Sequence, residues 1–183
     1  MKEDIKKEIE LPEQVSIDLN LTIKITGPQG EVEKKLIHPK IKIKQEEGKI
    51  ILESKNATKK GKKIINSFEA HIKNMISGVN EKHTYKIKIC SGHFPMNVSV
   101  NNNQLIVKNF IGENTPRKLD IKTGAEVKVE GDEIIVASTS KEIAGQVAAD
   151  IEQLTKIKKK DIRIFQDGCY ITEKAGKKLD KEK

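Results

Sequence analysis

Residues 127–136 read Val-Lys-Val-Glu-Gly-Asp-Glu-Ile-Ile-Val, and residues 41–52 read Ile-Lys-Ile-Lys-Gln-Glu-Glu-Gly-Lys-Ile-Ile-Leu. Each stretch starts with apolar side chains that alternate with polar ones and then reaches a glycine, Gly131 or Gly48. Alternation with period two is typical of half-buried strands, and glycine suits the turn of a hairpin. The two stretches therefore predict two similar antiparallel hairpins, which begin 86 residues apart in the chain.

The hairpins belong to a longer internal repeat. Three further pairs of short segments match at offsets of 82 to 84 residues: 21–24 with 105–108, 30–31 with 112–113, and 35–36 with 118–119. Offsets that drift by a few residues are what insertions in loops produce. We interpret the 183 residues as a duplication, with one domain over about 1–82 and a second over 83–183.

A helical pattern comes after the strands of each unit. Apolar residues from Ile64 to Val79 recur at helical spacing, which predicts a helix over about 59–79 with Gly78 as its C-cap. In the second unit Thr139 and Glu142 have capping-box spacing, which predicts a helix over about 140–157. The predicted fold class is α+β, with two tandem duplicated domains in which an antiparallel β-sheet packs against one main α-helix.

The composition narrows the class of protein. The net charge is +8, and all but two of the 35 basic residues are Lys. Widely spread Lys suits contact with a polyanion, although a solvated, Lys-rich surface explains the composition equally well. No apolar run reaches the ~20 residues of a membrane span, and residues 1–7 lack an apolar signal core, so we expect a soluble, cytosolic protein. Two isolated cysteines exclude a disulfide framework and a cysteine-based zinc site.

Charge is polarised within the second unit. Residues 119–152 hold eight acidic and three basic side chains, a net charge of −5. Residues 156–178 hold eight basic and three acidic ones, a net charge of +5. This polarity predicts a nucleic-acid face in the basic C-terminal segment 156–183.

The basic segment has a readable local pattern. Alternating apolar residues predict a strand over 162–166, Asp167-Gly168 predicts a tight turn, and Tyr170 falls on the return strand. Lysines beside such a turn can contact phosphates, and Arg163 can contact a phosphate or a guanine edge through two hydrogen bonds. Tyr170 can hydrogen-bond to RNA or stack on it. The alternative is a solvated turn with both aromatic rings in the core, and for Phe165 we favour core packing.

This segment resembles the signature of a known family, the sixth large-subunit ribosomal protein in its archaeal and eukaryotic form. The family pattern has a Gln, a basic residue, Arg-x-Phe-x-Asp-Gly, an aliphatic residue, Tyr, and a later Lys or Arg. Cys169 replaces the usual aliphatic residue, and it is similarly small and easily buried. The remaining places are held by Gln153, Lys160, Arg163, Phe165, Asp167, Gly168, Tyr170 and Lys174.

The resemblance extends over nearly the whole chain. Segments 27–30 and 71–79 resemble the family's first domain, and 93–95 and 109–117 resemble the opening of its second. Gly92 is less typical of the family at its position, so the local loop is expected to differ. The family also has a duplicated domain, in agreement with the internal repeat of this chain.

The resemblance implies a non-catalytic constituent of the large ribosomal subunit, located in the cytoplasm. It implies binding to large-subunit ribosomal RNA mainly through the second domain, near the sarcin–ricin loop and the stalk base. Neighbouring large-subunit proteins and translation factors would lie close by, and no cofactor, metal or small-molecule substrate is implied. The residues that match the family pattern and are expected to bind RNA are Lys160, Arg163, Tyr170 and Lys174. Four more are expected to bind RNA on charge alone, namely Lys158, Lys159, Lys177 and Lys178.

Other motifs point to weaker alternatives. Cys90 and His93 are too close in sequence for a usual catalytic pair, and the four histidines lack metal-ligand spacing. Segment 27–30 lacks the Gly-Lys-Ser/Thr of a nucleotide loop, so we interpret it as a hairpin turn. The lysines of 59–63 fit either a second, weaker RNA or protein contact or a solvated basic turn. Two further function classes stay open, a nucleic-acid module outside the ribosome and a small enzyme or protein adaptor.

Overall fold

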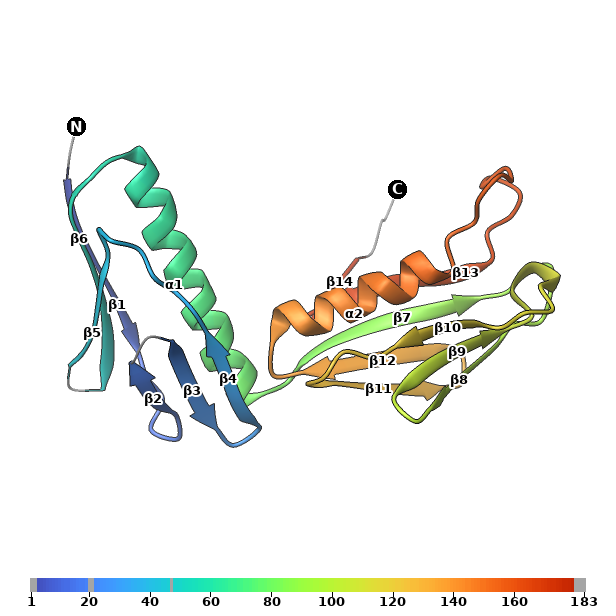
Figure 1. Ribbon diagram of the computed structural model, residues 1–183, viewed down its shortest axis with the longest axis horizontal. Helices are drawn as coiled ribbons and strands as arrows, with labels where there is room; N and C mark the ends of the chain where they lie inside the picture. The colour runs from blue at the N-terminus through green and yellow to red at the C-terminus, as the bar shows by residue number, and fades with distance from the viewer. Residues whose placement is uncertain (1–2, 20–21, 47, 180–183) are drawn as a thin grey trace. The chain divides into compact units, whose positions relative to one another are not determined.

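The computed structural model describes residues 3–19, 22–46 and 48–179. The chain divides into two compact units, residues 1–82 and 83–183. Each unit combines antiparallel strands with one α-helix, which confirms the predicted duplicated α+β fold (Figure 1). Neither helix in the described residues is long and apolar enough to cross a membrane.

The first unit consists of two three-stranded antiparallel sheets and one helix. One sheet has the order β1 (Glu3–Glu10), β6 (Lys49–Ala57), β5 (Lys42–Glu46), and the other has the order β2 (Ser16–Leu19), β3 (Ile23–Gly27), β4 (Gly30–Lys34). The helix α1 (Lys59–Asn80) contacts both sheets, and the apolar side chains of the two sheets and the helix form one core. The centre of this core is formed by Ile25, Ile50, Leu52, Ile65, Ile72 and Val79.

Both ends of α1 are fixed by hydrogen bonds. Thr58 is the N-cap, and its hydroxyl accepts a hydrogen bond from the Gly61 amide at 3.4 Å. The predicted C-cap is wrong, because Gly78 is buried inside the helix. The Glu81 amide instead donates to the Ser77 carbonyl at 2.8 Å, and the helix ends at Asn80.

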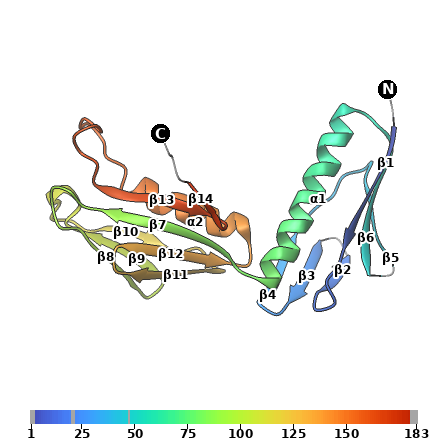
Figure 2. The ribbon, with the colours of Figure 1, turned by 180° about the vertical axis from the view of Figure 1, so that it is seen from behind.

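The second unit has the same order of strands and a longer sheet. The three-stranded sheet has the order β10 (Arg117–Asp120), β9 (Gln104–Lys108), β8 (Asn97–Asn101). The five-stranded sheet has the order β11 (Ala125–Glu130), β12 (Glu133–Ser138), β7 (His83–Cys90), β13 (Gly168–Lys174), β14 (Lys177–Lys178). The helix α2 (Lys141–Leu154) packs on this sheet, and β13 lies alongside β7 (Figure 2).

The two units differ mainly in the segment C-terminal to the helix. The sheets β1-β6-β5 and β7-β12-β11 correspond, as do β2-β3-β4 and β8-β9-β10. Only the second unit continues after its helix into a loop, residues 155–167, and the hairpin of β13 and β14. The basic segment therefore lies in the part of the second unit that the first unit lacks.

The ends of α2 differ from the predicted ones. Ser140 rather than Thr139 is the N-cap, and its hydroxyl accepts from the Ile143 amide at 3.5 Å. The helix ends at Leu154, three residues before the predicted end. The reason is Thr155, which is almost fully buried and whose hydroxyl accepts a hydrogen bond from the Cys169 amide at 2.9 Å. The chain turns away from the helix axis at this anchored residue.

The turn between β3 and β4 leads to a test of the first core. A Cβ atom added at Gly27 would lie 2.9 Å from Val79 Cγ2 and 3.0 Å from the Val79 carbonyl oxygen. Val79 is fully buried, so Gly27→Ala should lower the unfolding free energy by about 1–3 kcal/mol through overpacking. Urea denaturation measures this loss.

The matched control is Gly61→Ala. A Cβ atom at Gly61 would lie 3.5 Å from Ala57 Cβ, an ordinary contact, in the first turn of α1. This variant should be neutral or stabilised by up to about 1 kcal/mol, because alanine favours helix. Equal stability of the two variants would contradict the close packing of the turn against α1.

Candidate nucleic-acid interface

The loop of residues 155–167 does not contain the predicted strand. Residues 162–164 form turns, and the side chains of Ile162 and Ile164 are 71% and 62% exposed. Asp161 causes the difference, because its carboxylate accepts from the Arg163 amide at 2.9 Å. Its carbonyl accepts from the amides of Ile164 and Phe165 at 3.2 and 2.9 Å. Aspartate often closes such local turns, and here the turn prevents pairing with another strand.

Asp167 anchors the far end of this loop. One carboxylate oxygen accepts hydrogen bonds from the amides of Gly92 and His93 at 2.6 and 2.9 Å. The other oxygen lies 2.6 Å from His93 Nδ1, and because an ionised carboxylate can only accept, Nδ1 carries the proton. Asp167 is only 3% exposed, and Gly168 already begins β13 opposite Cys90, so the predicted tight turn at Asp167-Gly168 is wrong. This residue joins the loop to the end of β7, more than 70 positions away in sequence.

The environment of Asp167 favours its charged form. Burial by itself would raise the pKa of this carboxyl group. Hydrogen bonds from the His93 amide, the His93 ring and the Gly92 amide more than offset burial, and the pKa of Asp167 is lowered below its ordinary value of 3.8. The anchor is therefore a carboxylate at neutral pH.

The ring of Phe165 contacts one side chain of the loop and one from the segment after β7. Phe165 stacks on His93 with ring centroids 4.7 Å apart, and Lys160 Nζ lies 4.5 Å from the centroid of Phe165. Phe165 is half-buried in this stack and lies outside the core of the second unit, contrary to the predicted core packing. Lys160 is thus held at the surface by a cation–π contact.

Two side chains at the C-terminal end of α2, one of them the C-cap residue, accept hydrogen bonds from the outer edge of β13. The Cys169 amide donates to Thr155 at the end of the helix, and the Ile171 amide donates to Glu152 Oε1 at 3.3 Å. Gly168 has φ of +150°, and a Cβ there would lie 3.2 Å from the Thr155 carbonyl oxygen, so only glycine fits. Burial raises the pKa of the Cys169 thiol to about 11, which leaves it protonated and unreactive at neutral pH.

The predicted RNA-binding residues form two groups. All eight are exposed. Lys158, Lys159, Lys160 and Arg163 lie on the loop, with Tyr170 close by on β13. Lys174, Lys177 and Lys178 lie at the opposite end of β13, which at about 3.3 Å per residue is roughly 20 Å from Gly168. The structure therefore brings five of the eight residues together and leaves the other three apart.

The two arginines have different roles. Arg117 is buried by about three quarters, donates to the Leu154 carbonyl at 2.6 Å and lies 4.2 Å from the ring centroid of Phe110. It also pairs with Glu113, whose pKa it lowers. Arg163 is 87% exposed and pairs with Asp161 through bonds of 3.1 and 2.9 Å. Arg117 thus closes the end of α2, and Arg163 is available to solvent.

Sequence reasoning missed several residues of this surface. Lys88 is exposed and lies directly opposite Tyr170 in the register of β7 and β13. Alternation along the strand could have predicted its exposure, because Lys88 has its side chain on the face opposite to that of the buried Ile87. His93 and Glu152 were missed because their partners, Asp167 and Ile171, are brought close only by the fold.

The described residues hold no group of three or more His, Cys, Asp or Glu side chains that could bind a metal ion. The fold and its basic extension define a duplicated α+β protein, each of whose units has its own core.

Comparison with known proteins identifies the family. The family model described as Ribosomal protein L6 matches residues 11–82 and 94–168, one segment in each unit. The chain therefore belongs to the ribosomal protein L6 family, whose members are structural proteins rather than enzymes. The expected resemblance is confirmed, as is the duplication.

Individual relatives match over nearly their whole length. The large ribosomal subunit protein uL6 of Methanococcus vannielii is 46% identical over 176 residues, which cover 96% of this chain and 97% of the relative. The uL6 of Nanoarchaeum equitans is 45% identical, covering 97% of both chains. The uL6 of Natronomonas pharaonis is 40% identical, covering 92% of this chain and 96% of the relative.

The Asp167 anchor leads to a test of the loop's stability. Asp167→Ala leaves the amides of Gly92 and His93 without their acceptor and should lower the unfolding free energy by about 1–3 kcal/mol. Asp167→Asn keeps an acceptor oxygen but loses the charge, so its loss should be smaller. Asp161→Asn in the same loop is the control, and because Asp161 is exposed it should change little.

The same variants predict a pH dependence. A carboxyl group with a lowered pKa in the folded state stabilises the protein above its unfolded pKa, and this contribution is lost as the pH falls through the folded pKa. The advantage of the wild type over Asp167→Asn should therefore be constant near neutral pH, begin to fall near pH 3.8 and decrease further as the pH approaches the lower pKa of the folded state. Urea denaturation between pH 7 and pH 3 measures it, and a pH-independent difference would contradict the charged anchor.

Proposed function

We propose that this protein is a structural constituent of the large ribosomal subunit in the cytoplasm and binds large-subunit ribosomal RNA through its second unit. Family membership and the relatives named large ribosomal subunit protein support the assembly. The observation that carries the RNA-binding role is the segment that the second unit adds to the shared fold, with eight basic and three acidic residues over 156–178. A non-catalytic role agrees with the family.

The mode of binding is argued from the side chains of the loop. Lys158, Lys159 and Lys160 are exposed, and in the described part of the chain none of them pairs with a carboxylate. Unpaired surface ammonium groups exchange their counterions for phosphates, which gives affinity without sequence selectivity. Side chains cannot easily read the deep, narrow major groove of an RNA helix, so we propose that the loop recognises phosphates and shape.

The position within the subunit is a finer part of this proposal. We propose that the second unit lies in the last domain of the RNA, near the sarcin–ricin loop and the stalk base, with other large-subunit proteins and translation factors as neighbours. The resemblance of 153–174 to the family signature supports this position. Lys174, Lys177 and Lys178 would form a second phosphate contact, separate from the loop.

Sedimentation tests the assembly. In a sucrose gradient of cell extract, the protein should migrate with the large subunit and stay there after a moderate salt wash. A crosslinker placed within residues 158–178 should then react with large-subunit ribosomal RNA. Recovery at the top of the gradient would contradict the proposal and would favour a nucleic-acid module outside the ribosome.

Charge removal tests the interface. The double variant Lys160→Ala, Arg163→Ala should bind large-subunit ribosomal RNA on the order of tenfold more weakly, with the salt slope of log K reduced by roughly one unit per lost phosphate contact. Filter binding over a series of salt concentrations measures both. Lys128→Ala is the matched control, since Lys128 is exposed on β11, at the other edge of the same sheet. An unchanged slope in a stable double variant would remove these residues from the interface.

A further inference from the structure

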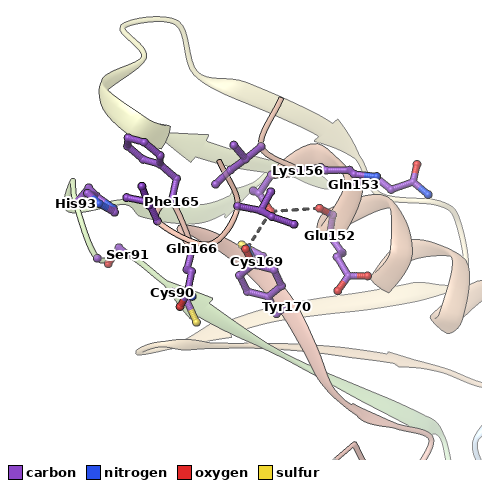
Figure 3. A pocket seen from close by; sticks show the side chains of 15 residues that line it. Cys90, Ser91, His93, Glu152, Gln153, Lys156, Phe165, Gln166, Cys169 and Tyr170 are labelled. Atoms are coloured by element: carbon purple, nitrogen blue, oxygen red, sulfur yellow. Dashed lines mark hydrogen bonds between the residues drawn. The ribbon is translucent and has the colours of Figure 1, made fainter. Parts of the chain in front are cut away.

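The loop of residues 155–167 arches over a hollow in the second unit. The hollow has a volume of about 1040 Å³ and lies between the loop, the end of α2 and the start of β13 (Figure 3). Glu152 and Gln153 of α2 lie on one side, Tyr170 and Cys169 of β13 lie at the base, and His93 lies at the far end. This volume is at the upper end of the range for small-molecule sites in proteins.

Part of the lining is apolar and open to solvent. Ile162 and Ile164 are 71% and 62% exposed, although they lie on the most basic stretch of the chain. Tyr170 is 42% exposed, and its ring packs over Gly168 on one side, where a Cβ would lie 3.4 Å from the ring carbons. Exposed apolar side chains around a hollow are typical of a binding site. The tyrosine ring and these isoleucines thus give the hollow an apolar surface that suits a flat ligand.

The carboxylate at one side of the hollow disfavours a phosphate beside it. Glu152 contributes a carboxylate, which accepts from the Ile171 amide through one oxygen at 3.3 Å and has a second oxygen for another donor. Gln153 and Gln166 contribute amide groups. A carboxylate repels a phosphate but accepts hydrogen bonds from the amino group of a nucleobase. The interior can therefore hydrogen-bond to a nucleobase, whereas the lysines at the rim can contact the phosphates of the nucleic-acid backbone.

We propose that this hollow binds an unpaired base of the ribosomal RNA, which stacks on Tyr170 while its phosphates contact the rim. This base site rests on the proposed RNA-binding function, and its ligand is a single unpaired nucleotide of that RNA. Lys156 lines the hollow, and Lys160 Nζ lies 4.5 Å from the ring centroid of Phe165, which also lines it. This net positive rim favours a nucleic acid over a segment of another protein. Recognition of unstacked bases on aromatic side chains is a common mode of RNA binding.

Paired variants of Tyr170 separate base stacking from phosphate contact. With full-length protein and deproteinised archaeal large-subunit ribosomal RNA, Tyr170→Leu should weaken binding roughly 5- to 150-fold, the effect of losing one stacked base. The salt slope should stay at the wild-type value, because no charge is lost. Tyr170→Phe keeps the aromatic ring and should bind within about twofold of the wild type. Thermal unfolding checks that both variants fold.

Chemical probing gives an independent readout. The wild type and Tyr170→Phe should protect one unpaired A or C from dimethyl sulfate, and Tyr170→Leu should not, while protection of the backbone from hydroxyl radicals persists. If both variants bind and protect like the wild type, the base site is overturned while the proposed function stands, and a protein side chain becomes the alternative occupant. A lower salt slope in Tyr170→Leu would also overturn it. Wild-type protein that binds this RNA no better than a plain RNA duplex would overturn the proposed function itself.

Discussion

The carboxylate of Asp167 is the interaction on which the second unit's added segment depends. It accepts two amide hydrogen bonds and one from the His93 ring, and it is the point at which the loop is tied to β7. Residues 156–166 otherwise have few buried contacts, since most of their side chains are exposed. Without the anchor, positioning the lysines against RNA would cost the conformational entropy of the whole loop at the moment of binding. Because the buried carboxylate of Asp167 already fixes the end of the loop in the free protein, part of this entropy is lost on folding rather than on binding.

The duplicated fold shows at which strand edge the second unit could take up this segment. In both units a helix covers the sheet that contains the first strand, and among the described residues of the first unit that strand, β1, lies at the edge of its sheet. In the second unit, β13 pairs along that edge of β7, and Thr155 and Glu152 then satisfy the outer amides of β13. An edge closed by side chains does not offer a row of free amides to other chains. The extension therefore adds a new surface and also closes the edge of the sheet at β7.

Sequence patterns predicted the fold well and the site only in part. Alternation and helical spacing gave the strands and the two helices, because burial of one face imposes both periods. Alternation cannot fix a register to better than two residues, and strand pairing places Ile43 opposite Leu52 and Val127 opposite Val136, an offset of 84 rather than 86. The prediction of a strand over 162–166 was wrong because Asp161 accepts hydrogen bonds from three nearby backbone amides and so forms a turn. The sequence did contain this information, since aspartate favours turns. Contacts such as that of Asp167 with His93 join residues 74 positions apart, and no local pattern contains them.

The ion pair of Arg163 with Asp161 shows how the loop can be ordered and still be ready to bind. The guanidinium donates twice to a carboxylate two residues away, and this pair lowers the pKa of Asp161. Because Arg163 is 87% exposed, solvent screens the pair, and exchanging the carboxylate for a phosphate costs little. Lys160 is held in the same way by the weak attraction of an aromatic ring. Arg117, in contrast, is held by the Leu154 carbonyl, a carboxylate and Phe110, and could not leave without opening the end of α2. Arg163 and Lys160, the cations proposed to contact RNA, are thus weakly restrained, whereas Arg117 is strongly restrained and maintains the end of α2.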